Sequence, residues 1–525
     1  MVARLRFAVA VGAVVVSTPA LAANTNPWIV VDYTAGTYPI SPYIYGMAEY
    51  GLNPTFQQEA ALGVVRWGGD GTTRYNWQVD SSNAGFDWYF VGGNGEANPT
   101  PSGGPDALVV ADQAAGSQTL ITIPIIPWIN STSQYTCSFR VSVYGQQQEE
   151  DPYPPIQNDN CGNSIALNGT QLLDTNIPYN HIPNQSSIQS GWVQHLVGRF
   201  GAGNAGGVMF YQLDNEPYGW GNTHRDVEPN GATYATIASL GQQYAAAVKQ
   251  ADPTALVLGP SDFTLGGWIG DPSAQNGLYA GQYYLQQMAA YQAATGKRAL
   301  DYFDEHYYFE FSNPAEQLLS TRTLWDPQYN GHTWVERWFF HAPMMLIPRF
   351  RQWVDTYYPG TKLALSEYSI DSGQKSITDA LAEADVLGIF GREKLDLASM
   401  WSPPAPTDPI AFSFLLYRNF DGRGSQYGAT YVPTTSLNQT IVAAYGAAGT
   451  VNGAAVTTLV LINKTNAVQN CPVSFRGQTP NGSAAMYSYS GADLTQFHQL
   501  ANVGFSNGKA TVAVPAMSMN MLVVP

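Results

Sequence analysis

GVMFYQLDNEPYGW, residues 207–220, is the stretch that decides the fold of this chain. Its first half, Val208–Leu213, is apolar, β-branched and aromatic enough to form a buried strand. The strand is followed at once by Asp214–Pro217, a polar cluster closed by a proline, which cannot donate to a central sheet. Such a cluster taken alone is more often a turn with an Asx cap, but an α/β barrel keeps its chemistry at the same place, the carboxyl end of a buried strand.

A second strand ends in the same way 151 residues later, and this repetition favours the barrel. Lys362–Tyr368 reads KLALSEY, with Glu367 at the end of the apolar run. Counted together, eight apolar strands with intervening helical segments predict an α/β fold, a (β/α)8 barrel whose site lies at the carboxyl face of the strands. The other predicted barrel strands are Pro42–Gly46, Gly63–Gly69, Leu120–Ile126, Ala255–Gly259, Leu300–Phe303 and Ala398–Trp401.

The pattern changes after about Asp421, which indicates a second domain. Residues 426–525 show short alternating strands such as Thr457–Ile462 and Ala510–Val514, separated by Asn, Gly and Ser turns, and we interpret them as a C-terminal all-β sandwich. The catalytic barrel is then expected to span residues 41–425. The segment 23–40 contains one short strand that we expect to join the sandwich.

Residues 1–22 have the form of a secretory signal peptide. Arginines at positions 4 and 6 precede the apolar run Phe7–Val16, and Ala20-Leu21-Ala22 is a small-x-small cleavage site. We therefore expect a secreted protein, extracellular or periplasmic, that is cleaved near Ala22. Cleavage would remove two arginines and no acid, so the net charge would move from −16 to −18. Such a surface argues against nucleic acid and anionic membranes as partners, but it does not exclude a neutral polysaccharide.

The chain contains three cysteines, Cys137, Cys161 and Cys471. In an oxidising compartment Cys137 and Cys161 are the candidate disulfide, because they would close a long polar segment at about residues 130–190. We expect that segment to be an ordered wall of the cleft and Cys471 to be a buried thiol. The cysteines and histidines show no spacing typical of a structural zinc site.

Two carboxyl groups at one barrel mouth indicate glycoside hydrolysis, which needs one carboxyl that holds a proton and one that stays ionised. Glu216 and Glu367 end predicted strands four and seven, and in a retaining enzyme their carboxyls are about 5–5.5 Å apart. Asn215 is placed to bind the sugar 2-hydroxyl, with a neutral turn amide as an equal alternative. Glu305 and His306 are the main rivals for a catalytic role, and they are equally good candidates for orienting Glu367.

Further candidates for substrate binding follow strands or lie in loops. Flat apolar faces of sugars stack on aromatic rings, although buried packing is the more common role of any single tryptophan. The predicted substrate-binding residues, besides Asn215, are Arg66, Trp67, Trp77, Trp128, Trp220, His306, Tyr308, Trp325 and Trp401.

Six blocks of sequence, taken in order, carry a resemblance to a known family. They are RWGGDGTTRYNWQVDSSNAGFDW (66–88), LDNEPYGWGNTHRDVEPN (213–230), DYFDEHYYFE (301–310), LALSEYS (363–369), ALAEADVLGIFG (380–391) and LYRNFDGRGSQYG (416–428). In these blocks the chain resembles glycoside hydrolase family 44.

The resemblance implies an endo-β-1,4-glucanase or xyloglucanase that retains configuration, on a barrel with a β-sandwich. By matching motif, Glu216 is the acid/base and Glu367 the nucleophile. The resemblance also implies that catalysis requires no cofactor and that a structural calcium ion can bind, with ligands that the sequence does not indicate. The sequence around His306 reads Glu-His-Tyr-Tyr where the family pattern leads us to expect Leu-His-Trp-Tyr, and this departure bears on the choice of substrate.

Two alternatives stay open. A glycosidase of the same fold could act on mannan or xylan, because a fold does not determine its substrate. A non-catalytic glycan-binding protein is the alternative from a different class, but it would require the loss of one carboxylate, and both are present. We expect a monomer whose partner is a β-glucan polysaccharide.

Overall fold

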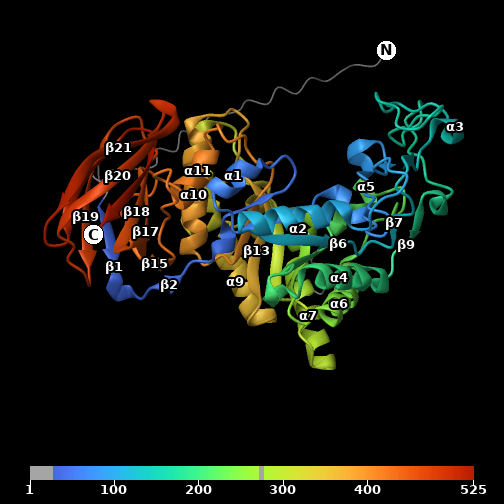
Figure 1. The fold of residues 1–525 in the computed structure, drawn as a ribbon, viewed down its shortest axis with the longest axis horizontal. Helices are drawn as coiled ribbons and strands as arrows, with labels where there is room; N and C mark the ends of the chain where they lie inside the picture. Colours follow the sequence, from blue (N-terminus) through green and yellow to red (C-terminus); the bar gives the residue numbers. More distant parts are fainter. Residues whose placement is uncertain (1–27, 271–276) are drawn as a thin grey trace, which may run out of the picture.

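The computed structural model describes residues 28–270 and 277–525, so the predicted signal peptide, residues 1–22, lies outside the described residues. Figure 1 shows a body of helices and strands beside a layered group of β-strands drawn in orange and red. Within the described ranges, no helix combines the length and the apolar character needed to cross a membrane.

Eight parallel strands close into a barrel, which confirms the predicted (β/α)8 fold class. The ring closes where β14 pairs with β3, with Ser399 opposite Gly46. In chain order the barrel strands are β3 (Gly46–Ala48), β4 (Val64–Trp67), β6 (Gln118–Ile123), β10 (Phe210–Leu213), β11 (Leu256–Asp262), β12 (Tyr302–Tyr308), β13 (Lys362–Ser369) and β14 (Leu397–Met400). The α-helices of this body, apart from two short ones, are α1 (Pro54–Glu59), α2 (Gly103–Ala115), α4 (Ser186–Phe200), α6 (Tyr234–Ala251), α7 (Ala280–Thr295), α8 (Pro314–Ser320), α9 (Leu346–Tyr357), α10 (Ile377–Arg392) and α11 (Ala411–Arg418).

The ends of several barrel strands differ from the predicted ones, and the first and sixth strands differ most. Pro42–Ile44 form a short 3-10 helix instead of the first strand, because the fixed φ of proline suits a first helical turn and the Ser41 hydroxyl caps it by accepting from the backbone N–H of Tyr43. The strand predicted to end at Phe303 continues to Tyr308. The polar residues after Phe303 therefore lie inside β12 and not in a following loop.

The barrel interior is built in layers. Its lower layer is apolar and consists of Val64, Leu120, Phe210, Leu258, Tyr302, Ala364 and Leu397. Because side chains alternate along a strand, the next inward layer comes two positions later, and there it is polar. Asp304 lies in that layer and accepts hydrogen bonds from the hydroxyls of Ser261 (2.6 Å) and Ser366 (2.7 Å). These serines explain how β12 can bury a carboxylate within a strand.

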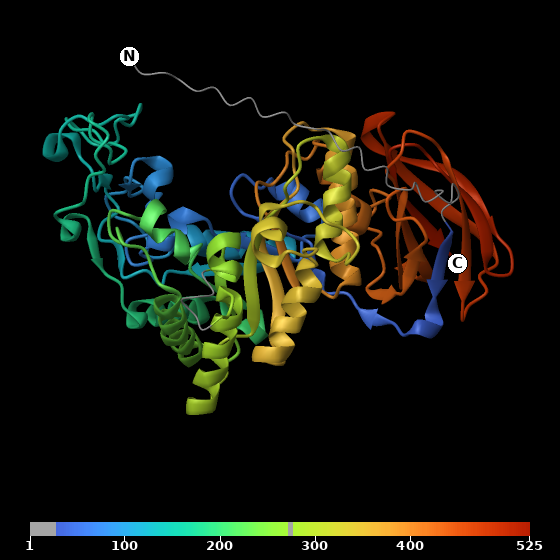
Figure 2. The same cartoon turned by 180° about the vertical axis from the view of Figure 1, so that it is seen from behind.

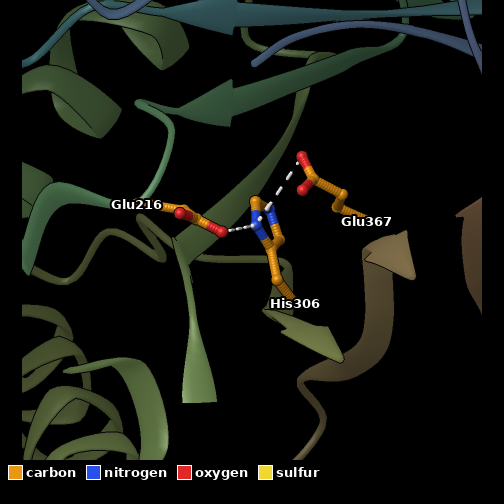
Figure 3. A group of neighbouring side chains, drawn as sticks. All are labelled: Glu216, His306 and Glu367. Carbon is orange, nitrogen blue, oxygen red and sulfur yellow. Dashed lines mark hydrogen bonds and ion pairs between the residues drawn. The ribbon is translucent and has the colours of Figure 1, made fainter. Parts of the chain in front are cut away.

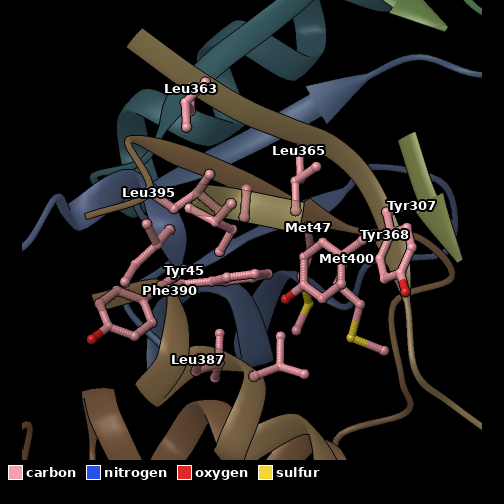
Figure 4. Packing of buried hydrophobic residues seen from close by; sticks show 14 of the residues in the cluster. Tyr45, Met47, Tyr307, Leu363, Leu365, Tyr368, Leu387, Phe390, Leu395 and Met400 are labelled. Carbon is pink, nitrogen blue, oxygen red and sulfur yellow. The ribbon is translucent and has the colours of Figure 1, made fainter. Parts of the chain in front are cut away.

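The outward faces of the last strands pack against α10. Figure 4 shows Leu365 and Tyr368 of β13 and Met400 of β14 in one apolar cluster with Leu387 and Phe390 of α10. The rings of Tyr368 and Phe390 meet edge to face, with centroids 5.1 Å apart. The strand that carries Glu367 is thus fixed from outside by a buried helix.

The C-terminal residues form two sheets around a separate apolar core. One sheet has the order β2 (Tyr38–Pro39), β15 (Thr430–Val432), β17 (Val442–Val451), β18 (Ala454–Asn463), β23 (Ser518–Val524), β20 (Gly482–Ser490) and β21 (Asp493–Phe505). The other has the order β16 (Thr434–Ser436), β1 (Ile29–Asp32), β19 (Gln469–Arg476) and β22 (Lys509–Val514). Strand β1 pairs antiparallel with β16 and parallel with β19, and Figures 1 and 2 show it in blue among the red strands.

A buried ion pair joins the barrel to this sandwich. Asp385 of α10 accepts hydrogen bonds from the ammonium of Lys464 (2.7 Å) and the hydroxyl of Tyr445 (2.7 Å). Both charged side chains are only 3 % exposed. Tyr445 lies in β17 and Lys464 directly follows β18, so helix α10 contacts the sandwich as well as the barrel.

The polar segment of residues 130–190 extends from the barrel on the side away from the sandwich, as both views show in teal. Its base is closed by pairing of β7 (Trp128–Asn130) with β9 (His181–Pro183). Within it, Cys137 of β8 (Thr136–Cys137) and Cys161 form a disulfide, and α3 (Val141–Tyr144) lies between them in the chain. The remaining cysteine, Cys471, is a buried free thiol.

Candidate active site

Glu216 lies directly after β10, in a turn with an unusual backbone. Asp214 and Glu216 both adopt the left-handed region, with φ of +65° and +50°. For residues other than glycine this costs about 1–3 kcal/mol each and is found mainly at functional sites. The Asp214 carboxylate stabilises the turn by accepting hydrogen bonds from the backbone N–H of Ile125 (2.6 Å) and Ile126 (3.1 Å) and from the Thr73 hydroxyl (2.8 Å). Burial raises the pKa of Asp214 to about 6, although these bonds oppose the rise.

A β-bulge turns Glu367 into the barrel mouth. Ala364 faces the interior, so simple alternation along β13 would point Glu367 outward. However, the register between β12 and β13 shifts, because Asp304 pairs with Ala364 whereas His306 pairs with Glu367. The extra residue in β13 allows both Ser366 and Glu367 to face inward.

Three side chains surround the Glu367 carboxylate. Arg66 of β4 donates through Nη1 to Oε2 at 2.6 Å, and the Tyr308 hydroxyl donates to Oε1 at 2.6 Å. The Nδ1 atom of His306 lies 3.8 Å from Oε2. Burial alone would raise the pKa of Glu367, but the electrostatic influence of His306 and Arg66 and the two hydrogen bonds outweigh it and hold the pKa below its usual value. The site therefore favours the ionised form of this carboxyl.

His306 lies between the two glutamates, as Figure 3 shows. Its Nδ1 is 2.8 Å from Oε1 of Glu216. One carboxylate oxygen from each glutamate and a ring nitrogen of His306 all lie within 4.8 Å of one another. The Glu216 side chain is 26 % exposed and that of Glu367 only 8 %. Two carboxyls of different environment thus face one small space, which suits a reaction with one proton donor and one ionised group.

Arg66 fixes more than Glu367. Its Nη2 donates to Oδ1 of Asn215 at 2.6 Å, and its Nε donates to Oε1 of Gln212 at 2.8 Å. The amide of Asn215 in turn donates to Asp70 at 2.7 Å. One guanidinium thereby sets the positions of a candidate catalytic carboxylate and of the residue that precedes the other.

Asp70 belongs to the site although sequence reasoning missed it. It follows β4 and two glycines, so a carboxylate after a barrel strand was the available signal. Burial, followed by the negative charges of Asp87 and Glu216, raises its pKa well above the usual value. This favours a protonated Asp70 at the edge of the carboxylate pair.

Four of the predicted substrate-binding residues gather around the two glutamates: Asn215, His306, Tyr308 and Trp401. Trp401 follows β14, is half-buried, and its ring centroid lies 5.8 Å from the Arg66 guanidinium carbon. Tyr308 is 45 % exposed while it bonds Glu367, so its ring is open to a bound molecule.

Three other predictions of substrate contact are wrong. Arg66 has no exposed surface, and it donates to protein groups. Trp220 is 1 % exposed, and its indole N–H donates to Asp214 at 3.3 Å. The ring of Trp325 is covered by the Arg392 guanidinium, 4.0 Å from its centroid, at the end of α10 that precedes β14 and therefore opposite the barrel mouth.

Three further tryptophans are half-buried beside the barrel. Trp67 meets the ring of Trp192 edge to face at 5.6 Å, and Trp77 lies 5.5 Å from the ring of His195, so both pack against α4. Trp128 begins β7 at the base of the 130–190 segment. A role for these three in substrate binding stays a prediction.

Glu305, a rival for catalysis, is separated from the carboxylate pair. It is fully buried, pairs in register with Asp262 of β11, and its carboxylate lies against Gly267. Burial and the charges of Asp262 and Asp304 raise its pKa well above the usual value. Glu305 is thus a structural carboxyl, whereas its neighbour His306 contacts both glutamates.

The carboxylate pair with His306 is also the one cluster within the described residues that is spaced to hold a metal ion. It does not fit a structural calcium ion, which prefers six to eight oxygen ligands, because it offers a ring nitrogen and a carboxylate already paired with Arg66. No residues are therefore assigned as ligands of the predicted calcium ion.

Comparison with known proteins gives consistent matches. The sequence model of glycoside hydrolase family 44 matches residues 81–311. The structure is similar to that of CelM2, a bifunctional glucanase-xylanase from a metagenome library, with 33 % identity, a TM-score of 0.88 and coverage of 95 % of this chain and 99 % of that one. A family 44 xyloglucanase from Paenibacillus polymyxa is 26 % identical with a TM-score of 0.79 over 95 % and 99 % of the two chains. Endoglucanase A of Paenibacillus lautus is 28 % identical over 519 residues, which span 92 % of this chain and 70 % of that protein.

Replacing Arg66 by methionine is expected to raise the pKa of the Glu367 carboxyl, because the variant removes a buried positive charge and a hydrogen bond that favour the ionised form. The measurement is a pH titration of side-chain carboxyl carbon-13 signals by NMR, in which the Glu367 signal is the one that Glu367→Gln removes. Arg66→Lys is the matched control, because it keeps the charge but loses the fork of donors. The pKa of Glu367 in this variant should lie between its values in the wild type and in Arg66→Met. A midpoint in Arg66→Met at or below that of the wild type would contradict this role of the guanidinium.

Proposed function

The chain belongs to glycoside hydrolase family 44, and from this premise we propose that it is an endo-acting hydrolase of β-1,4-glucan chains, cellulose-like or xyloglucan, that retains anomeric configuration. One observation carries the mechanism: Glu216 and Glu367 present carboxylate oxygens within 4.8 Å of each other at one barrel mouth. Retaining glycosidases have carboxyls about 5–5.5 Å apart, and inverting ones leave about 6.5–9.5 Å for a water. The short separation supports double displacement.

In the proposed reaction Glu367 attacks the anomeric carbon while Glu216 protonates the leaving glycosidic oxygen. The glycosyl-enzyme is then hydrolysed by a water whose proton passes to Glu216. The environments support this division of roles, because Arg66 and Tyr308 stabilise the charge on Glu367, whereas Glu216 is the more exposed carboxyl and bonds the His306 ring. One of the two carboxyls must carry a proton while the other is ionised, so their surroundings are expected to differ.

The substrate class is supported by the names of similar proteins, which include a xyloglucanase and an endoglucanase. Xylan is the second candidate substrate, since the relative at 33 % identity is described as a glucanase-xylanase. The two residues that depart from the family pattern, Glu305 and Tyr307, are buried on either side of His306 and contact Gly267 and Thr323, so any influence on this choice would pass through their neighbours His306 and Tyr308.

Export is part of the proposal. It is supported by the leader-like residues 1–22 and by the Cys137–Cys161 disulfide, because disulfides persist in oxidising compartments. Expression of the full chain in a secreting bacterium should give protein in the periplasm or medium whose N-terminus, read by mass spectrometry, lies just after Ala22. Cytoplasmic protein that keeps residues 1–22 would contradict export.

The function is tested by reducing-sugar release from xyloglucan, carboxymethylcellulose, xylan and mannan. The wild type should act on at least one of the first two. Glu367→Gln should reduce release to background, and Glu216→Gln should lower kcat by about 10²–10⁴-fold, the usual contribution of general acid–base catalysis. Glu59→Gln, at an exposed glutamate of α1, is the matched control and should behave as the wild type.

Each outcome of this assay separates one alternative. Release of reducing sugar from xylan or mannan alone would support glycoside hydrolysis but contradict the proposed glucan substrate. Wild-type activity that survives in Glu367→Gln would refute the mechanism. Binding of these polymers without any release would indicate the non-catalytic glycan-binding alternative.

Retention predicts a covalent intermediate on Glu367. Incubation with an activated 2-fluoro cellobioside should trap it, since the fluorine slows hydrolysis more than it prevents attack. Peptide mass spectrometry is expected to find the label on Glu367 in the wild type and in the control variant Glu59→Gln. A label on any other residue would overturn the assignment of Glu367 as the nucleophile. Inactivation by the inhibitor without any label on Glu367 would overturn it as well.

A further inference from the structure

A buried carboxyl that the proposed mechanism does not use lies behind β13, in the interior of α10. Glu383 belongs to this helix, whose residues 378–391 are all buried. A helix that is buried all round is normally apolar, and a carboxyl within it is costly unless it is paired. One oxygen of Glu383 accepts a hydrogen bond of 2.7 Å from the Tyr368 hydroxyl, and the other has no partner among the described residues. Tyr368 is therefore the group toward which this carboxyl is directed.

Tyr368 lies at the point where β13 recovers its pairing after the bulge. Between its pairs with Asp304 and His306, β13 advances by three residues while β12 advances by two. On its other side β13 advances by three residues, from Leu365 to Tyr368, while β14 advances by two. The extra residue is thus present against both neighbouring strands. Tyr368 is the first residue after it that pairs with both, opposite Tyr307 and Met400.

The backbone and the side chain of Tyr368 are both held. Its carbonyl accepts a hydrogen bond of 2.8 Å from the backbone N–H of Trp401, which lies beside Arg66. Its ring packs edge to face on Phe390 in the apolar cluster of Figure 4. From this cluster the hydroxyl reaches Glu383. A hydrogen bond in such surroundings is strong, and a polar group that loses its partner there is costly.

This hydrogen bond distinguishes the observed register of β13 from its neighbours. Because side chains alternate along a strand, a slip by one residue would turn Tyr368 toward the barrel interior and Glu367 toward α10. The slip would also separate the Tyr368 hydroxyl from Glu383 and leave two polar groups buried without partners. An apolar pair at these two positions would impose no such penalty on the slipped register.

We propose that Tyr368 and Glu383 are positioning residues for the reaction, because their hydrogen bond fixes the bulge of β13 and thereby the direction of the Glu367 carboxylate. The catalytic meaning of that direction rests on the proposed function. Both residues have no exposed surface, so neither touches the reacting space. Their effect reaches the site through the peptide bond between Glu367 and Tyr368 and through the contact of the Tyr368 carbonyl with Trp401.

The kinetic test uses the polymer that the wild type hydrolyses. Tyr368→Phe and Glu383→Leu each remove the hydrogen bond, and kcat should fall by about 10–10²-fold with little change in KM, as for a reacting group that is slightly displaced. Burial raises the pKa of Glu383 to about 8, so Glu383→Gln resembles its neutral form and should keep most of the wild-type kcat. Tyr417→Phe is the matched control and should keep it too, since the buried Tyr417 hydroxyl donates to the backbone of the same helix, at Ala384, and not to β13.

The double variant Tyr368→Phe/Glu383→Leu separates positioning from stability. It removes both polar partners, so no buried group is left unpaired, and its Tm should recover toward that of the wild type. Its kcat should nevertheless stay low, because no hydrogen bond sets the register of β13. Recovery of kcat together with Tm would overturn the proposal, and so would a wild-type kcat in Tyr368→Phe.

A measurement without turnover keeps this proposal apart from the proposed function. The carboxyl carbon-13 signal of Glu367, identified by its loss in Glu367→Gln, is recorded by NMR at one pH in the folded variants. The signal should move in Tyr368→Phe, because the carboxylate changes its contacts with Arg66 and Tyr308, and it should stay in place in Glu383→Gln. An unmoved signal in Tyr368→Phe would overturn the positioning role even if the enzyme hydrolyses glucan. A moved signal in a protein that hydrolyses nothing would support the positioning role while the proposed function fails.

Discussion

The buried guanidinium of Arg66 is the interaction on which the geometry of the site depends. A charge without exposed surface is tolerated in a protein only when its donors are paired, and Arg66 pairs with Glu367, Asn215 and Gln212. Its planar fork fixes directions as well as distances. Because these partners come from β13 and from the end of β10, one side chain of β4 links the strands that carry both candidate catalytic carboxylates.

The layers of the barrel explain why such a charge is located there. Below Arg66 the interior is filled with apolar side chains, while Arg66, Gln212 and Asp304 form a polar level whose hydrogen bonds reach Glu367 and Asn215 above it. Above it the two glutamates face the mouth. The bulge in β13 is what lets consecutive residues serve two levels, with Ser366 bonded to Asp304 and Glu367 turned toward the reacting space. Strand alternation without the bulge would point Glu367 toward α10.

The sequence was sufficient for the fold and for the two glutamates, because apolar strands followed by carboxylates form a pattern that can be read locally. It was not sufficient for side-chain direction. The bulge depends on pairing between β12 and β13, so nothing local to KLALSEY indicates that Glu367 faces inward. The same limit explains Trp220 and Trp325, which follow strands or lie in loops as predicted but pack against Asp214 and Arg392. Asp70 was readable by the same rule as Glu216, because it is also a carboxylate that follows a barrel strand.

The sandwich acts on the catalytic strand through α10. On one side this helix is tied to the sandwich by Asp385, which accepts from Lys464 and Tyr445. On the other side Glu383, one half-turn earlier, accepts from the hydroxyl of Tyr368 at 2.7 Å. Tyr368 directly follows Glu367, and burial raises the pKa of Glu383 to about 8, which favours the neutral form of this carboxyl. A chain of buried contacts therefore runs from the second domain through α10 to the residue beside the proposed nucleophile.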